Sequence, residues 1–170
     1  MMKEQIIDMR SCCDFLKDAE FKITAKEINR LNVVSLSPAA RAAMYGVLSF
    51  NRGTVGQALS FIKVGKELTL NDEERVLLLH IEGILLSMVG DGQGAIERQH
   101  ESLEGCSLLN DTKLTAEVLS HLSFLYRVRG EKELAKKYEK QAARLLLRKG
   151  TFKHTPAKRQ AIKKKEKPLP

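Results

Sequence analysis

Residues 83–95 read GILLSMVGDGQGA, and this stretch decides the predicted fold. Gly83 lies seven positions before Gly90, and Ala95 follows five positions after that glycine. Two helices joined by a tight turn pack closely only where small side chains let the backbones approach, and the turn needs a residue that tolerates positive φ. The same spacing recurs in two other sets, which are Gly46, Gly53 and Ala58, and Ser123, Gly130 and Ala135. The sequence therefore predicts three helix pairs that stack, because one pair alone cannot bury its apolar face.

Helix-capping signals on both sides of this stretch predict where the other helices begin and end. Ser37 and Pro38 suit an N-cap and a first helical position, and Asn71 and Asp111 suit the N-caps of two later helices. We expect helices over residues 38–50, 54–65, 72–89, 92–108, 112–129 and 131–148, with two more over 4–20 and 24–31. No segment alternates with a period of two, so the predicted fold class is all-α. The predicted parts are N-terminal helices (1–36), a helical repeat domain (37–148) and a basic tail (149–170).

This pattern resembles the tetratricopeptide repeat (TPR) family over residues 38–148. The matching residues are Gly46, Gly53, Ala58, Gly83, Gly90, Ala95, Gly130 and Ala135, and Tyr126 falls at the family's aromatic position in the third pair. Ser123 stands at the third small site, the family's Trp and closing Pro are missing, and the period exceeds the family's length of about 34 residues. The resemblance implies a TPR-like right-handed α-solenoid of three helix pairs with one or two N-terminal helices. A generic up-and-down bundle is the alternative.

The resemblance also implies a concave face lined by the first helix of each pair. Helical spacing places mostly apolar side chains on that face, and such a groove suits an apolar segment of another protein. The predicted partner-binding residues are Ala43, Val47, Phe50, Leu77, His80, Ile84, Ser120, Phe124 and Arg127. We therefore expect an adaptor or a chaperone. The alternative is that the chain's own N-terminal helices, or a second copy in a homodimer, cover this face.

The net charge of +8 is concentrated at the C-terminal end of the sequence. From Arg148 onward there are nine Lys or Arg and one Glu, so the first 147 residues are formally neutral. Dense like charge with few apolar residues is typical of a disordered extension. Such a tail can neutralise phosphates, which makes a nucleic-acid-associated regulatory protein the second hypothesis, or it can be a solvated extension alone. The candidate nucleic-acid-binding residues are Lys158, Arg159, Lys163, Lys164 and Lys165.

Several other classes of protein are not favoured by the sequence. No apolar run approaches the length of a membrane span, and the first residues lack a secretory signal, so we expect a cytoplasmic protein. Three cysteines do not form a disulfide framework. The four histidines lack metal-ligand spacing, and GDGQG at 90–94 lacks the Lys-Ser/Thr ending of a phosphate loop. We therefore expect no catalytic site, no metal and no cofactor.

Overall fold

The computed structural model describes residues 9, 10, 12 and 36–148, and this part of the chain is helical without a strand. The predicted all-α class is therefore confirmed for these residues. The six helices are α3 (Pro38–Asn51), α4 (Val55–Glu67), α5 (Asp72–Met88), α6 (Gly92–Leu109), α7 (Thr112–Val128) and α8 (Lys132–Arg148). The helix predicted over 24–31, most of the helix predicted over 4–20 and the tail over 149–170 lie outside the described residues.

Side-chain caps begin four of the helices in the structure, and three of them, Ser37, Asn71 and Asp111, were predicted. Ser37 Oγ accepts a hydrogen bond from the backbone N–H of Ala40 at 3.1 Å, which caps α3. The side chains of Asn71, Asp91 and Asp111 accept from the third residue after each of them and cap α5, α6 and α7. Each cap satisfies a backbone donor that has no partner inside its own helix. Local sequence thus sets where these helices begin.

Glycine ends the first helix of each pair, and the three turns share one geometry. Gly53, Gly90 and Gly130 adopt φ angles of 78°, 87° and 83°. At each turn the residue after the glycine donates its N–H to a carbonyl five residues earlier, at 2.9 to 3.0 Å. This is the bond of a Schellman motif, in which a left-handed residue closes the helix end. The prediction that these glycines lie in the turns is therefore confirmed.

The helix predicted to end at about Gly65 ends two residues later. The helix continues to Glu67, and Gly65 is buried inside it. A Cβ added at Gly65 would lie 3.3 Å from both Ala42 Cβ and Leu78 Cδ2, so this glycine lies where α3 and α5 approach α4. Here the glycine serves close packing rather than a turn, and sequence alone does not separate these two uses.

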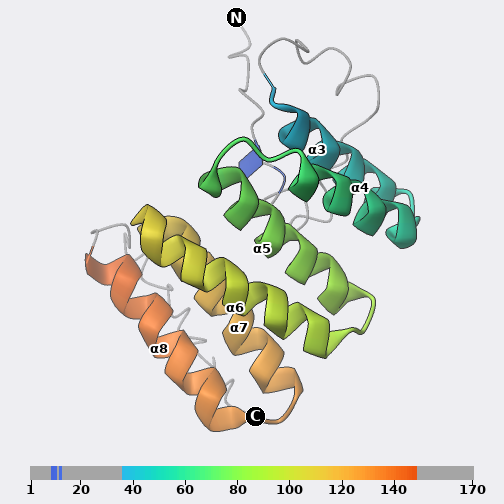
Figure 1. Ribbon diagram of the computed structural model, residues 1–170. Coiled ribbons are helices and arrows are strands. Elements are labelled where there is room, and N and C mark those ends of the chain that lie inside the picture. Colours follow the sequence, from blue (N-terminus) through green and yellow to red (C-terminus); the bar gives the residue numbers. More distant parts are fainter. Residues whose placement is uncertain (1–8, 11, 13–35, 149–170) are drawn as a thin grey trace, which may run out of the picture.

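The helices pack in chain order, as three hairpins that follow one another (Figure 1). The closest packing is within the pairs α3–α4, α5–α6 and α7–α8. Consecutive pairs meet through α4–α5 and α6–α7, and the first helices touch through α3–α5 and α5–α7. Among these six helices, the first pair makes no contact with the third pair. The first helices α3, α5 and α7 therefore share one side of the domain.

The small residues of the repeat lie at the crossings within the pairs. A Cβ added at Gly46 would lie 3.3 Å from the carbonyl oxygen of Ala58, and Ser123 Oγ donates to the carbonyl oxygen of Ala135 at 2.9 Å. In the second pair, Gly83 faces Gln99 of α6. The alanines at positions 58, 95 and 135 are all buried. The predicted close approach of the paired helices is therefore present in each pair.

Candidate functional site

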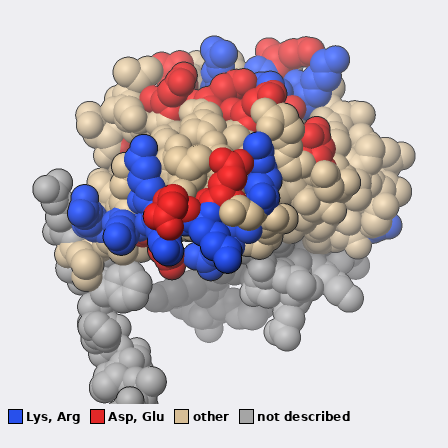
Figure 2. All heavy atoms as spheres, turned by 90° about the horizontal axis from the view of Figure 1, so that it is seen from below, with Lys and Arg blue, Asp and Glu red and all other residues tan. Residues whose placement is uncertain are grey.

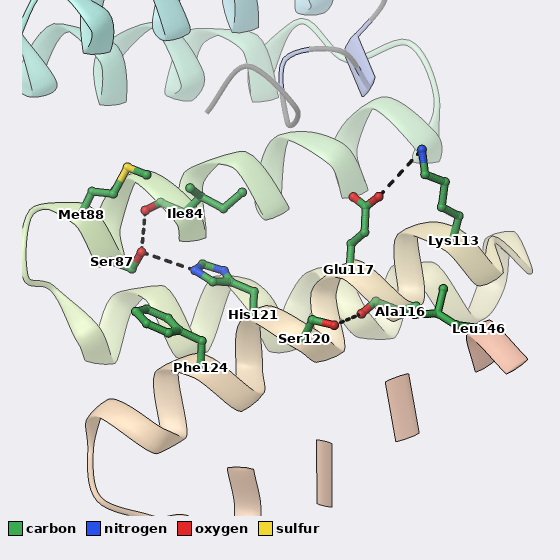
Figure 3. Close-up of a pocket in the computed structure, with 10 residues that line it drawn as sticks. All are labelled: Ile84, Ser87, Met88, Lys113, Ala116, Glu117, Ser120, His121, Phe124 and Leu146. Atoms are coloured by element: carbon green, nitrogen blue, oxygen red, sulfur yellow. Dashed lines mark hydrogen bonds and ion pairs between the residues drawn. The ribbon is translucent and has the colours of Figure 1, made fainter. Parts of the chain in front are cut away.

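A pocket of about 870 Å³ opens between α5 and α7 (Figure 3). The last turns of α5 form one wall of the pocket, and one face of α7 forms the other wall along most of that helix. A single leucine of α8 completes the lining. The lining residues are Ile84, Ser87, Met88, Lys113, Ala116, Glu117, Ser120, His121, Phe124 and Leu146. Since the same side of α7 points into the pocket over several turns, the site is a groove along that helix.

One end of the pocket is apolar and exposed to solvent. The side chain of Phe124 is 55% exposed and that of Met88 is 48% exposed, whereas Ile84 is buried. The Phe124 ring stacks on the His121 ring, with centroids 6.1 Å apart and an interplanar angle of 7°. The stacked Phe124 ring lies at the pocket (Figure 3). Large apolar side chains held in such positions are typical of surfaces that bind a partner.

The other end of the pocket carries charge. Lys113 Nζ lies 3.9 Å from Glu117 Oε1, one helical turn along α7. Ser120 Oγ, further along the helix, donates to the carbonyl oxygen of Ala116 at 2.8 Å. The pocket therefore runs from an ion pair near the start of α7 to an aromatic ring near its end (Figure 3).

Ser87 and His121 meet on the floor of the pocket, but not as a nucleophile and a base. Ser87 Oγ donates to the carbonyl oxygen of Ile84 at 2.7 Å and lies 3.4 Å from His121 Nε2. A nucleophilic serine must direct its proton to the histidine within hydrogen-bond reach. In this structure the serine proton is directed to the backbone carbonyl instead, so the pair joins α5 to α7.

The structure brings only part of the predicted binding surface into this pocket. Ile84, Ser120 and Phe124 line it. Arg127 is exposed next to it and pairs with Glu139 of α8 at 3.0 Å. The other five predicted residues are covered in the structure: Ala43, Val47, Leu77 and His80 are buried, and Phe50 is half-buried against the core.

The N-terminal segment contributes to the burial of the predicted surface. Met9 and Cys12 are buried in the same apolar cluster as Val47 and Leu77. The intervening Arg10 contacts the first turn of α5 and the N-cap of α7 through ion pairs with Glu73 and Asp111. Of the described N-terminal residues, Arg10 therefore lies against the starts of α5 and α7.

His80 has a structural environment. Its ring Nδ1 lies 2.7 Å from Gln99 Oε1, and Gln99 Nε2 donates to the His80 carbonyl oxygen at 2.9 Å. Because the amide nitrogen is used by that carbonyl, the amide oxygen accepts from the imidazole, which fixes the hydrogen on Nδ1. Both side chains are fully buried. This two-point contact ties α5 to α6 beneath the pocket.

Sequence reasoning missed several lining residues, most of which had a detectable signal. Positions three or four residues apart share a face of a helix. From Phe124, steps of three or four residues lead back along α7 to His121 and then to Lys113, and from Ile84 one step leads to Met88. Leu146 carries no such signal, because its place depends on how α8 packs against α7.

No family model, curated protein or solved structure matches this chain. Within the described residues, no helix is long and apolar enough to cross a membrane. The same part of the chain holds no group of three or more His, Cys, Asp or Glu placed to bind a metal ion. The tail residues predicted to bind nucleic acid, Lys158, Arg159, Lys163, Lys164 and Lys165, lie outside the described residues.

Proposed function

We propose that this chain is a TPR-like right-handed α-solenoid that binds an amphipathic helix of a partner protein in the α5–α7 pocket, as an adaptor or chaperone. The observation that carries the proposal is the pair of exposed side chains, Phe124 and Met88, at the mouth of an apolar pocket. Covering a large apolar side chain stabilises a complex by about 1.5–3 kcal/mol when it becomes fully buried. These two residues are therefore the expected anchors.

The order of packing supports a solenoid rather than a closed bundle. Each helix pair contacts only the next pair along the chain, and the three turns repeat one geometry. A repeat array has contacts of this kind, since each unit meets only its neighbours. The first helices of the pairs then form a shared inner side, and the pocket lies on it between α5 and α7.

The length and shape of the pocket favour a helix as the occupant. From Lys113 to Phe124 the lining residues cover eleven steps along α7, which is about 16 Å or three turns of helix. A groove between two helices accepts an amphipathic helix through apolar residues at i, i+3, i+4 and i+7. At the other end of the inner side, Met9 and Cys12 are helical residues three positions apart and are buried in the shared core. Apolar residues at helical spacing in the chain's own N-terminal segment are thus buried in the core.

A cytoplasmic location forms part of the proposal. Cys106 is a buried, reduced thiol, which suits a reducing compartment. Cell fractionation with an antibody to the endogenous protein tests this point. Recovery of the protein in a secreted or periplasmic fraction would contradict it.

The binding test uses a synthetic probe of stated chemistry. A fluorescent amphipathic peptide with Leu at i, i+3, i+4 and i+7 is titrated with the full chain, and anisotropy is measured. We expect saturable binding of this peptide and none of its Leu-to-Ser counterpart. The double variant Met88→Ser with Phe124→Ser should bind the Leu peptide at least tenfold more weakly.

A matched control separates the pocket from general surface apolarity. Leu70 and Leu108 are 73% and 81% exposed and lie outside the pocket, so Leu70→Ser with Leu108→Ser should bind like the wild type. Equal binding by the wild type and the Met88/Phe124 variant would reject the proposal. Sedimentation of the two proteins tests the homodimer alternative, because a dimer that the Met88/Phe124 variant breaks would assign the pocket to a second copy.

A further inference from the structure

One face of α8 carries a row of basic side chains that is separate from the pocket. Lys132, Lys136, Lys140 and Arg144 follow one another at intervals of four residues, and all four are exposed. Four residues advance an α-helix by about 6 Å, so the row extends along about 18 Å of the helix. Residues at this interval are neighbours on the surface, so the cations lie side by side.

Few acidic groups neutralise this row. Lys136 pairs with Glu133 at 3.2 Å, and Glu139 is turned towards Arg127 of α7, at 3.0 Å. Within the part of the chain that the structure describes, Lys132, Lys140 and Arg144 form no ion pair. Figure 2 shows that Lys and Arg side chains on the underside of the molecule are interspersed with Asp and Glu side chains. Like charges at this spacing repel one another and destabilise a helix, so the row lowers the stability of α8.

We propose that this row binds the phosphate backbone of double-stranded nucleic acid without reading its sequence. A duplex carries one negative charge per about 1.7 Å of its axis, so about ten phosphate charges lie along the length of the row. Each lysine or arginine that approaches a phosphate releases a counterion, which supplies the affinity. The extended, regularly spaced cations of α8 match such a continuous line of charge.

Two features favour a duplex over other polyanions. A protein partner needs buried apolar anchors at the centre of its interface, and between Lys132 and Arg144 α8 exposes no large apolar side chain. A single strand is held mainly by stacking of its bases on aromatic rings. The one ring on α8, Tyr138, is half-buried and stacked on Tyr126, with centroids 5.4 Å apart. The row is therefore suited to the regularly spaced phosphate charges of a nucleic-acid duplex.

The sequence continues this charge beyond the helix. Residues 149–170 contain eight Lys or Arg and one Glu. In the sequence, the row on α8 is therefore followed by further cations. This inference is independent of the α5–α7 pocket, because none of Lys132, Lys136 or Lys140 lines it.

The test compares two triple variants of the full chain that change the net charge equally. In the first, Lys132→Gln, Lys140→Gln and Arg144→Gln remove the three cations of the row that form no ion pair. In the second, Arg52→Gln, Lys63→Gln and Arg75→Gln remove three exposed cations that lie outside α8. Binding to a short duplex of random sequence is measured by anisotropy over about 50–200 mM salt. We expect the row variant to lose at least tenfold in affinity and to lower the slope of log K against log salt by about 2–3, at about 0.9 for each phosphate contact. The control variant should keep a slope close to that of the wild type.

Two further arms complete the test. A second variant measures how much the tail contributes to the affinity for the duplex. It carries glutamine substitutions at Lys158, Arg159, Lys163, Lys164 and Lys165. If that variant abolishes binding while the row variant binds like the wild type, the row plays no part and the inference is overturned. It is also overturned if a poly-glutamate peptide binds more tightly than the duplex and depends on the row, since the partner is then an acidic protein segment. Helix content by circular dichroism should be unchanged in the row variant, because removing like charges from α8 does not destabilise it.

Discussion

The guanidinium Nη2 of Arg10 lies 2.6 Å from Oδ2 of Asp111, the N-cap of α7. The same guanidinium contacts Glu73 in the first turn of α5. One side chain of the N-terminal segment therefore joins the starts of the two helices that line the pocket. Asp111 also accepts a backbone hydrogen bond from Leu114 at 3.1 Å, so its carboxylate serves both the helix cap and this link.

The link predicts how stability changes in acid. Burial raises the pKa of Asp111, but the hydrogen bond from Leu114 and the contact with Arg10 outweigh it, and the pKa is lowered overall. The carboxylate therefore stabilises the fold at pH values above its unfolded pKa of about 3.9, and this contribution is lost as the pH falls through the lower folded value. Arg10→Met should cost about 1 kcal/mol or less at neutral pH, since the pair is partly exposed.

Urea unfolding at pH 7 and pH 3 measures this difference. The gap between wild type and Arg10→Met should narrow at pH 3, because this pH lies below the unfolded pKa of Asp111 and part of the stabilisation by its carboxylate is lost there. Arg75→Met changes an exposed arginine of α5 and serves as the control. A gap of the same size at both pH values would show that Arg10 does not act through the carboxylate.

Cys106 offers a second test at the other end of the pH range. Burial raises the pKa of its thiol to about 11, although hydrogen bonds with Ser102 and Thr115 lower it. Because the thiolate is the reactive form, Cys106 should resist alkylation by iodoacetamide at pH 8 in the native protein and react after unfolding. Peptide mass spectrometry identifies the labelled residue. Rapid native labelling of Cys106 would show that the start of α7 opens often.

The same shift fixes the direction of a stability change in alkali. The raised folded pKa favours the neutral thiol, so its contribution is present below the unfolded pKa and is lost as the pH rises from about 9 to about 11. Cys106→Ser should show a weaker loss of stability over this interval. A steeper loss in the serine variant would contradict the assignment.

The helices and their pairing follow from local sequence, and the pocket does not. Ser37, Asn71 and Asp111 cap the helices that they were predicted to cap, and Gly53 and Gly90 adopt the positive φ angles that the turns require. Each of these effects acts within a few residues, so the residues next to each cap or turn are sufficient to predict it. Gly65 shows the limit, because its role depends on α3 and α5 rather than on its own neighbours.

Helical spacing predicts which residues share a face, but not whether another element covers that face. Val47 and Phe124 were both placed on the open side by the same argument. In the structure Val47 is fully buried in the cluster that includes Met9, whereas Phe124 is exposed in the pocket. The difference arises from contacts between residues far apart in the chain, and periodicity does not report such contacts. Val47→Asp should therefore unfold the protein rather than test binding.

Gly83 and Gln99 form a packing contact that a double-mutant cycle can measure. A Cβ added at Gly83 would lie 2.2 Å from Gln99 Nε2, and Gln99 is fully buried. Gly83→Ala should therefore displace Gln99 from its two hydrogen bonds with His80 and cost about 1–3 kcal/mol. In a Gln99→Ala background the new methyl group has room, so the same change should cost at least about 1 kcal/mol less. Additive effects in urea unfolding would show that the two positions do not compete for space.

Tyr126 connects the second helix pair to the third, and its two contacts can be separated. Its hydroxyl lies 3.0 Å from His100 Nε2 of α6, and its ring stacks on Tyr138 of α8 at an interplanar angle of 13°. Tyr126→Phe keeps the ring and removes the hydroxyl, so it should cost about 0.5–1.5 kcal/mol, as for a typical hydrogen bond. Tyr126→Ala also removes the stack and should cost more.

Tyr138→Phe is the control, because it keeps the stacked ring and leaves the hydroxyl of Tyr126 in place. It should change the free energy of unfolding by less than Tyr126→Phe does, as measured in urea. If Tyr126→Phe is the more destabilising of the two variants, the contact between the second and third helix pairs depends on the hydroxyl of Tyr126. If Tyr126→Phe matches the wild type while Tyr126→Ala is unstable, ring packing alone joins α6, α7 and α8, and the hydrogen bond to His100 contributes nothing to the stability of the array.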